Sequence, residues 1–173
     1  FAIHNLEFML TAVFSGIIIS ALLVPFGRFV MQCMPLAVSL LPALLFAYFC
    51  TFIPQISGGN PVMFHYEWIP TFGVDLNFLV DGLSLLFALM ITGVGTLVFW
   101  YSSAYMKGHP ELHKFYAYLS LFMAAMLGMV LSDNMIALFV FWELTSISSF
   151  FLIGFNSKDA GSKKSAIIAL AVT

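Results

Sequence analysis

Apolar residues form long runs along this chain, and short polar segments separate the runs. Five runs are long enough to cross a bilayer, at residues 8–26, 33–53, 79–101, 115–131 and 134–155, and a sixth begins near Lys164. About 20 apolar residues span the roughly 30 Å of bilayer hydrocarbon at about 1.5 Å per residue. The pattern predicts an all-α polytopic membrane protein with five full transmembrane helices and the start of a sixth.

Two prolines and the end of the chain add detail to this prediction. Pro25 is expected to close the first helix, and Pro42, inside the second run, is expected to kink the second helix. The sixth run stops after "SAIIALAVT", which is too short to cross a bilayer. We therefore expect the chain to be a piece of a longer protein.

The composition supports a membrane protein and excludes other classes. Hydrophobic residues make up 62% of the 173 residues and charged residues only 8%, whereas soluble domains are about one-quarter charged. The net charge of −2 and the lack of a basic patch argue against a nucleic-acid partner. Cys33 and Cys50 share one apolar run without metal-ligand spacing, so they are interpreted as small lipid- or core-facing residues.

The charges between the runs predict the orientation. All six basic residues fall on one side of the predicted bundle: Arg28, Lys107, Lys114, Lys158, Lys163 and Lys164. The other side carries Glu7, Glu67, Asp75 and Asp133. Lysine and arginine are enriched on the cytoplasmic side of membrane proteins, so the pattern predicts a cell-membrane protein with an external N-terminus.

The longest loop, residues 54–78, is predicted to form a short external β-hairpin. "VMFHYEW" is rich in strand formers, "IPTFG" offers a turn, and "VDLNF" alternates apolar and polar residues. His65 and Glu67 lie in this loop, but two such residues on a hairpin are more typical of a surface than of a metal site. No metal site is predicted.

Glu143 is the main candidate for chemistry. It is the tenth of the 22 residues in the run 134–155, which places its carboxylate near the bilayer midplane. An ionised acid there costs about 2.5–3.5 kcal/mol. Burial favours the protonated carboxyl and a nearby cation favours the ionised one, so a moving cation can load or release a proton. The alternative is a static interhelical hydrogen bond without a transport role.

Other polar residues are weaker candidates. Ser146 is three residues from Glu143 on the same helix face and can hydrogen-bond it or hold a water molecule. Asp81 is interpreted first as a helix N-cap. The segment "SDN", residues 132–134 with Asp133 and Asn134, can turn the chain and cap the start of the fifth helix. His109 and His113 belong to the cytoplasmic loop "KGHPELHK", where we expect them to be solvated, although two histidines there can relay protons.

Two segments carry a family resemblance: "FLVDGLSLLFALMITGVGTLVFWYSSAYM" and "LSDNMIALFVFWELTSISSFFLIGF". Together they are similar to the large antiporter-like subunits shared by Mrp-type cation/proton antiporters and respiratory complex I, over about residues 64–156. The sequence Trp142-Glu143-Leu144 resembles the Mrp A subunits more than the L-type subunits of complex I, which tend to carry Trp-Glu-Gly.

The resemblance implies the N-terminal part of a proton-translocating helical bundle, in which Glu143 pairs with a lysine on a later helix. It implies three parts: residues 1–63 with the first two helices and the start of the external loop, 64–114 with the hairpin and third helix, and 115–173 with the start of the proton-translocating core. The partners implied are the lipid bilayer, other subunits, H⁺ and Na⁺, with no cofactor. Three hypotheses remain open: a Na⁺/H⁺ antiporter subunit, a proton-pumping subunit of a redox-driven complex, and a membrane scaffold.

Overall fold

The fold is a bundle of long helices with one small β-hairpin. A computed structural model describes residues 2–33, 35–69, 74–106, 109, 111–155 and 160–172. In chain order the elements are α1 (Ala2–Cys33), α2 (Pro35–Cys50), α3 (Ile53–Ser57), β1 (Val62–Ile69), β2 (Val74–Val80), α4 (Gly82–Tyr105), α5 (Leu112–Leu131), α6 (Met135–Ile153) and α7 (Ala160–Val172). The predicted fold class is confirmed.

Five of these segments are long and apolar enough to cross a membrane, as predicted. They are Glu7–Gly27, Leu40–Ser57, Gly82–Tyr105, Leu112–Leu131 and Met135–Ile153. One boundary prediction is wrong, because α1 continues through Pro25 to Cys33. A proline removes a single backbone donor, and the helix on either side of it can continue where the freed carbonyl finds another partner.

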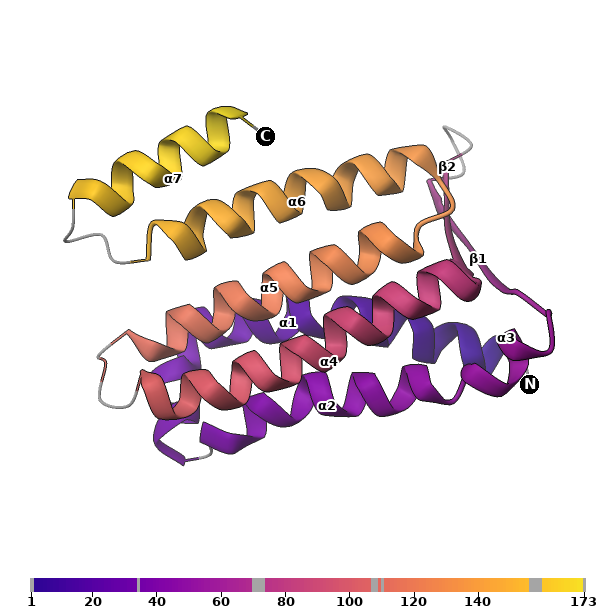
Figure 1. Ribbon diagram of the computed structural model, residues 1–173, viewed down its shortest axis with the longest axis horizontal. Coiled ribbons are helices and arrows are strands. Elements are labelled where there is room, and N and C mark those ends of the chain that lie inside the picture. Colours follow the sequence, from indigo (N-terminus) through magenta and orange to yellow (C-terminus); the bar gives the residue numbers. More distant parts are fainter. Residues whose placement is uncertain are drawn as a thin grey trace.

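The long helices run alternately up and down the bundle (Figure 1). The N-terminus, α3, the hairpin and the start of α6 lie at one end. The end of α1, the start of α5 and the start of α7, which carry Arg28, Lys114, Lys163 and Lys164, lie at the other end. Helix α5 is central: it packs against α1, α4 and α6, while α7 packs against α6. Because the helices alternate in direction, these basic residues lie at one end of the molecule.

The predicted hairpin is present and is attached to the helices. Strands β1 and β2 pair antiparallel, with Phe64 opposite Phe78 and Glu67 opposite Asp75. Leu79 and Val80, which were expected to begin a helix, are the last residues of β2, and α4 begins at Gly82. Phe78 also forms a β-bridge with Ser132 in the turn between α5 and α6. The hairpin therefore contacts that turn directly.

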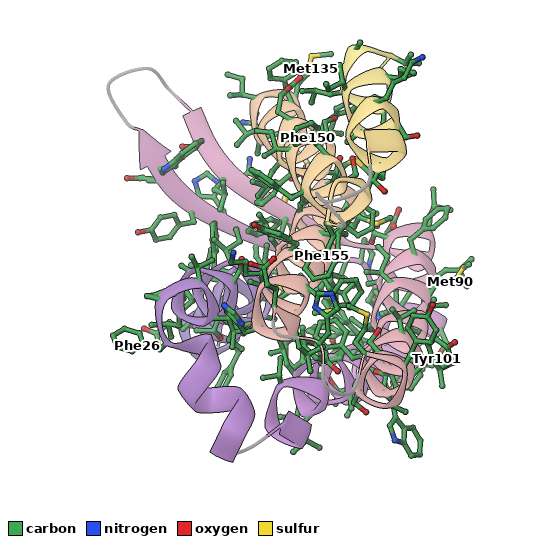
Figure 2. All side chains as sticks on the ribbon, turned by 90° about the vertical axis from the view of Figure 1, so that its left-hand side faces the viewer. Phe26, Met90, Tyr101, Met135, Phe150 and Phe155 are labelled. Carbon is green, nitrogen blue, oxygen red and sulfur yellow. The ribbon has the colours of Figure 1, made fainter. Side chains whose placement is uncertain are left out.

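The outside of the bundle is apolar. Phe26, Met90 and Tyr101 point away from the helices in Figure 2, and their side chains are 64%, 53% and 65% exposed. Leu97 and Trp100 are similarly exposed on α4. Such a surface is stable only against hydrocarbon or against other apolar protein surfaces. It fits a chain that spans a membrane.

Candidate functional site

Glu143 lies near the middle of α6, and its side chain is exposed. Within the described residues its carboxylate has neither a hydrogen bond nor an ion pair. The side chains one turn away on the same face, Phe139 and Ile147, are 61% and 43% exposed. The described residues therefore do not confirm that the Glu143 carboxylate is buried within protein. Glu143 is instead a single acid on an uncovered apolar face.

The opposite side of α6 forms the contact with the rest of the bundle. Phe141 is 3% exposed and packs against Phe14 of α1 and Phe78 of β2, with ring centroids 6.3 and 6.5 Å apart. Gly128 of α5 lies directly against the Phe141 ring, where an added Cβ would overlap it. Two residues along a helix correspond to about 200° of rotation. The packing of Phe141 therefore directs Glu143 away from the core.

Ser146 does not bind Glu143. It is 7% exposed, and its hydroxyl donates to the Trp142 carbonyl oxygen at 3.4 Å, which uses the backbone of its own helix. It lines a groove of about 260 Å³ between α5 and α6, together with Trp142, Thr145 and Ser149. Small hydroxyl side chains therefore border Glu143 on one flank of α6, without contacting it.

Asp81 is the N-cap of α4, as predicted. Its carboxylate accepts from the Ser84 amide at 2.8 Å, while the Ser84 hydroxyl accepts from the Asp81 amide at 2.8 Å. The hydrogen bond that the carboxylate accepts from the Ser84 amide is the main cause that holds the pKa of Asp81 below its usual range. Asp81 also lines a groove of about 400 Å³ whose opposite wall includes Trp142. Trp142 lines this groove and that of Ser146.

We predict that Asp81→Ala lowers the stability of the protein by about 1 kcal/mol at neutral pH, because the first turn of α4 loses its cap. The pKa of Asp81 is lowered in the folded state, so the contribution of the carboxylate is present above its usual pKa and is lost on acidification. Thermal midpoints in detergent, measured from pH 7 downward, should converge for wild type and Asp81→Ala. Asp81→Asn, which keeps an acceptor, should show a smaller loss. A difference in thermal midpoint that stays constant at every pH would contradict the assignment of Asp81 as an ionised N-cap.

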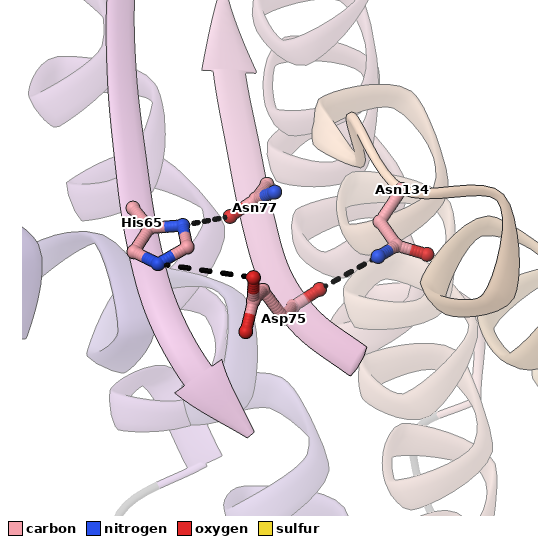
Figure 3. Close-up of polar contacts among 4 residues, drawn as sticks. All are labelled: His65, Asp75, Asn77 and Asn134. Carbon is pink, nitrogen blue, oxygen red and sulfur yellow. Dashed lines mark hydrogen bonds and ion pairs between the residues drawn. The ribbon is translucent and has the colours of Figure 1, made fainter. Parts of the chain in front are cut away.

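The turn before α6 is more structured than the sequence indicated. Asp133 is exposed, and its amide donates to the Asn77 carbonyl oxygen at 2.9 Å. Asn134 caps α6, with its Oδ1 accepting from the Ile136 amide at 2.8 Å. Its Nδ2 donates to the Asp75 carbonyl oxygen of β2 at 2.9 Å (Figure 3). The cap was predicted, but the hydrogen bond to β2 was not.

His65 completes a polar cluster on the hairpin (Figure 3). Its Nδ1 lies 2.6 Å from Asn77 Oδ1, and its Nε2 lies 3.9 Å from Asp75 Oδ2. Within the described ranges, no group of three or more histidine, cysteine, aspartate or glutamate side chains could hold a metal ion. Both ring nitrogens of His65 therefore face side chains of the neighbouring strand, β2.

The two histidines at the basic end differ from each other. His109 is exposed, its ring lies 5.4 Å from that of Phe155, and its Nδ1 accepts from the Glu111 amide. The expectation that His113 is a solvated loop residue is wrong: it lies in the first turn of α5 and is 5% exposed. Gly27 of α1 has no side chain, which lets α1 approach closely enough to cover His113.

An ion pair stands near these histidines. Lys114 Nζ lies 2.8 Å from Glu111 Oε1, and this hydrogen bond holds the pKa of Glu111 below its usual range. The pair lines a cavity of about 410 Å³ between α5, α6 and α7, whose other walls include Tyr118, Phe150 and Ala166. The structure thus places titratable groups and a cavity together at the basic end.

Comparison with known proteins identifies the family to which the chain belongs. Residues 68–116 match the family described as NADH-Ubiquinone oxidoreductase (complex I), chain 5 N-terminus, and residues 132–173 match the family described as NADH:quinone oxidoreductase/Mrp antiporter, TM. The chain is 49% identical over 134 residues to Na⁺/H⁺ antiporter subunit A1 of Staphylococcus haemolyticus and 48% identical over 133 residues to that of Staphylococcus aureus. Each alignment covers 75% of this chain and 17% of the relative.

Two solved structures have the same fold. A chain of the Mrp complex from Dietzia sp. DQ12-45-1b is 30% identical, with a TM-score of 0.79 over 97% of this chain and 18% of that chain. A chain of the membrane-bound sulfane sulfur reductase, an archaeal respiratory membrane complex, is 19% identical, with a TM-score of 0.80 over 93% of this chain and 33% of that chain. The second likeness concerns the fold alone.

The chain belongs to the family of antiporter-like membrane subunits that Mrp antiporters and complex I share. Within this family it is similar to the N-terminal part of the Mrp-type Na⁺/H⁺ antiporter A subunits, and it is a multi-pass membrane protein. It spans about a sixth of the length of the curated relatives that it matches.

Proposed function

We propose that this chain is the N-terminal part of a membrane subunit of a multi-subunit Na⁺/H⁺ antiporter, not an enzyme, and that Glu143 transfers the proton. The identity with the staphylococcal A1 subunits, 49% and 48%, supports the antiporter assignment. The single observation that supports the role of Glu143 is its position: one carboxylate at the middle of a membrane-spanning helix, on a face that the described residues leave uncovered.

The uncovered face has a direct consequence for this proposal. An acid in the hydrocarbon region faces a protein interior or a hydrated path and pairs with another group. Since the described residues supply no partner, the partner comes from elsewhere in the assembly. The family resemblance implies a lysine on a later helix, which would alternate between pairing with Glu143 and releasing it as protons move.

The other candidate residues have secondary roles in this proposal. Ser146 borders Glu143 on the flank of α6 and can hold a water molecule in the groove that it lines. Asp81 and Asp133 lie at the hairpin end, where they cap α4 and join the turn before α6. At the basic end, His109 is exposed and suited to collect protons, and the buried His113 would receive them from it.

A second function stands beside the first, because residues 68–116 match the complex I chain 5 family. In that reading the chain is part of a proton-pumping subunit driven by a redox reaction elsewhere in the complex. Vesicles containing the whole assembly separate the two functions. An antiporter acidifies or alkalinises the lumen when a Na⁺ gradient alone is imposed, whereas a redox-driven pump responds only when an electron donor and a quinone are supplied.

We predict that the hairpin end is external and the basic end cytoplasmic. Lys107 and Lys158, which the sequence places on the cytoplasmic side, lie outside the described residues, but Lys114 lies at the same end. In a variant without Cys33 and Cys50, Glu67→Cys should react with an impermeant thiol reagent in intact cells. Lys107→Cys should react only after the cells are opened. Labelling of position 107 from outside would overturn the topology.

A further inference from the structure

The hairpin holds α6 at two points. At the start of the helix, Asn134 uses both ends of its amide: Oδ1 caps α6 at 2.8 Å, and Nδ2 binds the Asp75 carbonyl oxygen of β2 at 2.9 Å (Figure 3). Further along the helix, Phe141 packs against Phe78 of β2, which is fully buried. The Asn134 hydrogen bond restrains α6 along its axis, and the packing of Phe141 restrains its rotation.

Both contacts bear on Glu143. Asn134 precedes Glu143 by nine residues, or about 13.5 Å along the helix axis. Phe141 lies on the opposite side of the helix, wedged among Phe14, Phe78 and Gly128. A change in either contact would move the carboxylate along the membrane normal or rotate it about the axis. Proton transfer depends steeply on the distance between donor and acceptor, so displacements of this kind change rates.

We propose that the β-hairpin sets the position of the Glu143 carboxylate, and that Asn134 is the positioning residue through which it does so. The remainder of the cluster stiffens this connection. The Asp133 amide bonds to the Asn77 carbonyl oxygen, and Ser132 bridges to Phe78, so the turn before α6 runs as a short extension of the sheet edge. His65 contacts Asn77 and Asp75 from β1 and ties the two strands together beside the Asn134 contact.

The role of Asn134 differs from that of an ordinary helix cap, and substitution can separate the two. Serine and aspartate are as favourable as asparagine at an N-cap, because each has an oxygen that accepts from the first turn. Neither retains the amide donor that reaches Asp75. Asn134→Ser and Asn134→Asp therefore keep the cap and lose the connection to β2. Asn60→Ser is the matched control, since Asn60 is an exposed asparagine at the same end of the bundle.

The first measurement is the distance between spin labels at Met63 of β1 and Met135 of α6, in the full-length protein within its assembly and without Cys33 and Cys50. Both side chains are exposed, at 61% and 86%. We expect a broader or displaced distance distribution in Asn134→Ser and Asn134→Asp, and the wild-type distribution in Asn60→Ser. Unchanged distributions in both Asn134 variants would overturn the inference, whatever the role of Glu143.

The second measurement is cation-driven proton movement and its pH profile, which rests on the proposed function. Loss of one hydrogen bond that orients α6 is expected to lower the rate about fivefold in both Asn134 variants, with normal assembly and a displaced pH profile. A purely structural role would change the amount of assembled protein and leave the profile in place. If Glu143→Gln inactivates transport while Asn134→Ser transports at the wild-type rate, the inference is overturned. If Glu143→Gln transports normally, the proposed function fails, and the label distances alone decide whether the hairpin holds α6.

Discussion

Replacing Gly16 should separate α1 from α5 and lower the stability of the assembled protein. An added Cβ at Gly16 would lie 2.7 Å from the Ser120 carbonyl oxygen and 2.8 Å from Ala124 Cβ on α5. The first of these contacts is with backbone, so no side-chain rotation can relieve it. Close helix approach through small residues is a principal source of stability between membrane helices. Even Gly16→Ala therefore forces the two helices apart.

We expect Gly16→Ala to cost about 1–3 kcal/mol, the usual range for overpacking, and Gly16→Leu to cost more. The measurement is the thermal midpoint of the assembled protein in detergent, with the amount of assembly checked on a native gel. Gly82→Ala is the control, since an added Cβ there would meet only Ile56 Cγ2 at 4.0 Å. A Gly16→Ala midpoint equal to that of Gly82→Ala would show that α1 and α5 are not in the contact described.

The membrane-spanning helices could be predicted from the sequence because their signal is local. Each is a run of apolar residues long enough for a bilayer, and the loop charges supply an independent check on their number. The hairpin was also predictable, since strand formers and turn residues alternate over a short range. The boundary errors have local causes too: Pro25 does not end α1, and Leu79 and Val80 are apolar residues of a strand.

The site could be predicted only in part. Glu143 stands out in the sequence because a charge in a long apolar run is costly, and Asn134 was recognisable as part of a capping turn. Its second hydrogen bond, to Asp75, joins residues 59 positions apart, and no local pattern reports it. The burial of His113 depends in the same way on Gly27 from a distant helix. The signal available in the sequence for the α5 interfaces is a row of small residues spaced by four: Ser120, Ala124 and Gly128.

The second large effect concerns Glu143. If its carboxylate alternates between a protonated state and an ion pair, ionisation is essential and hydrogen bonding alone is insufficient. Glutamine keeps the size and most of the hydrogen bonding but cannot ionise, so Glu143→Gln should stop transport and leave assembly intact. Aspartate keeps the charge on a side chain one methylene shorter, so Glu143→Asp should retain partial activity. A glutamate with a purely structural role predicts the reverse order, because glutamine removes a charge that is costly in hydrocarbon.

The measurement that tests this account most directly is Na⁺-driven proton movement in vesicles that contain the complete assembly with Glu143→Gln, compared with wild type at equal amounts of assembled protein. The account predicts proton movement no greater than in vesicles without the protein. Near-normal proton movement by the Glu143→Gln variant would contradict it.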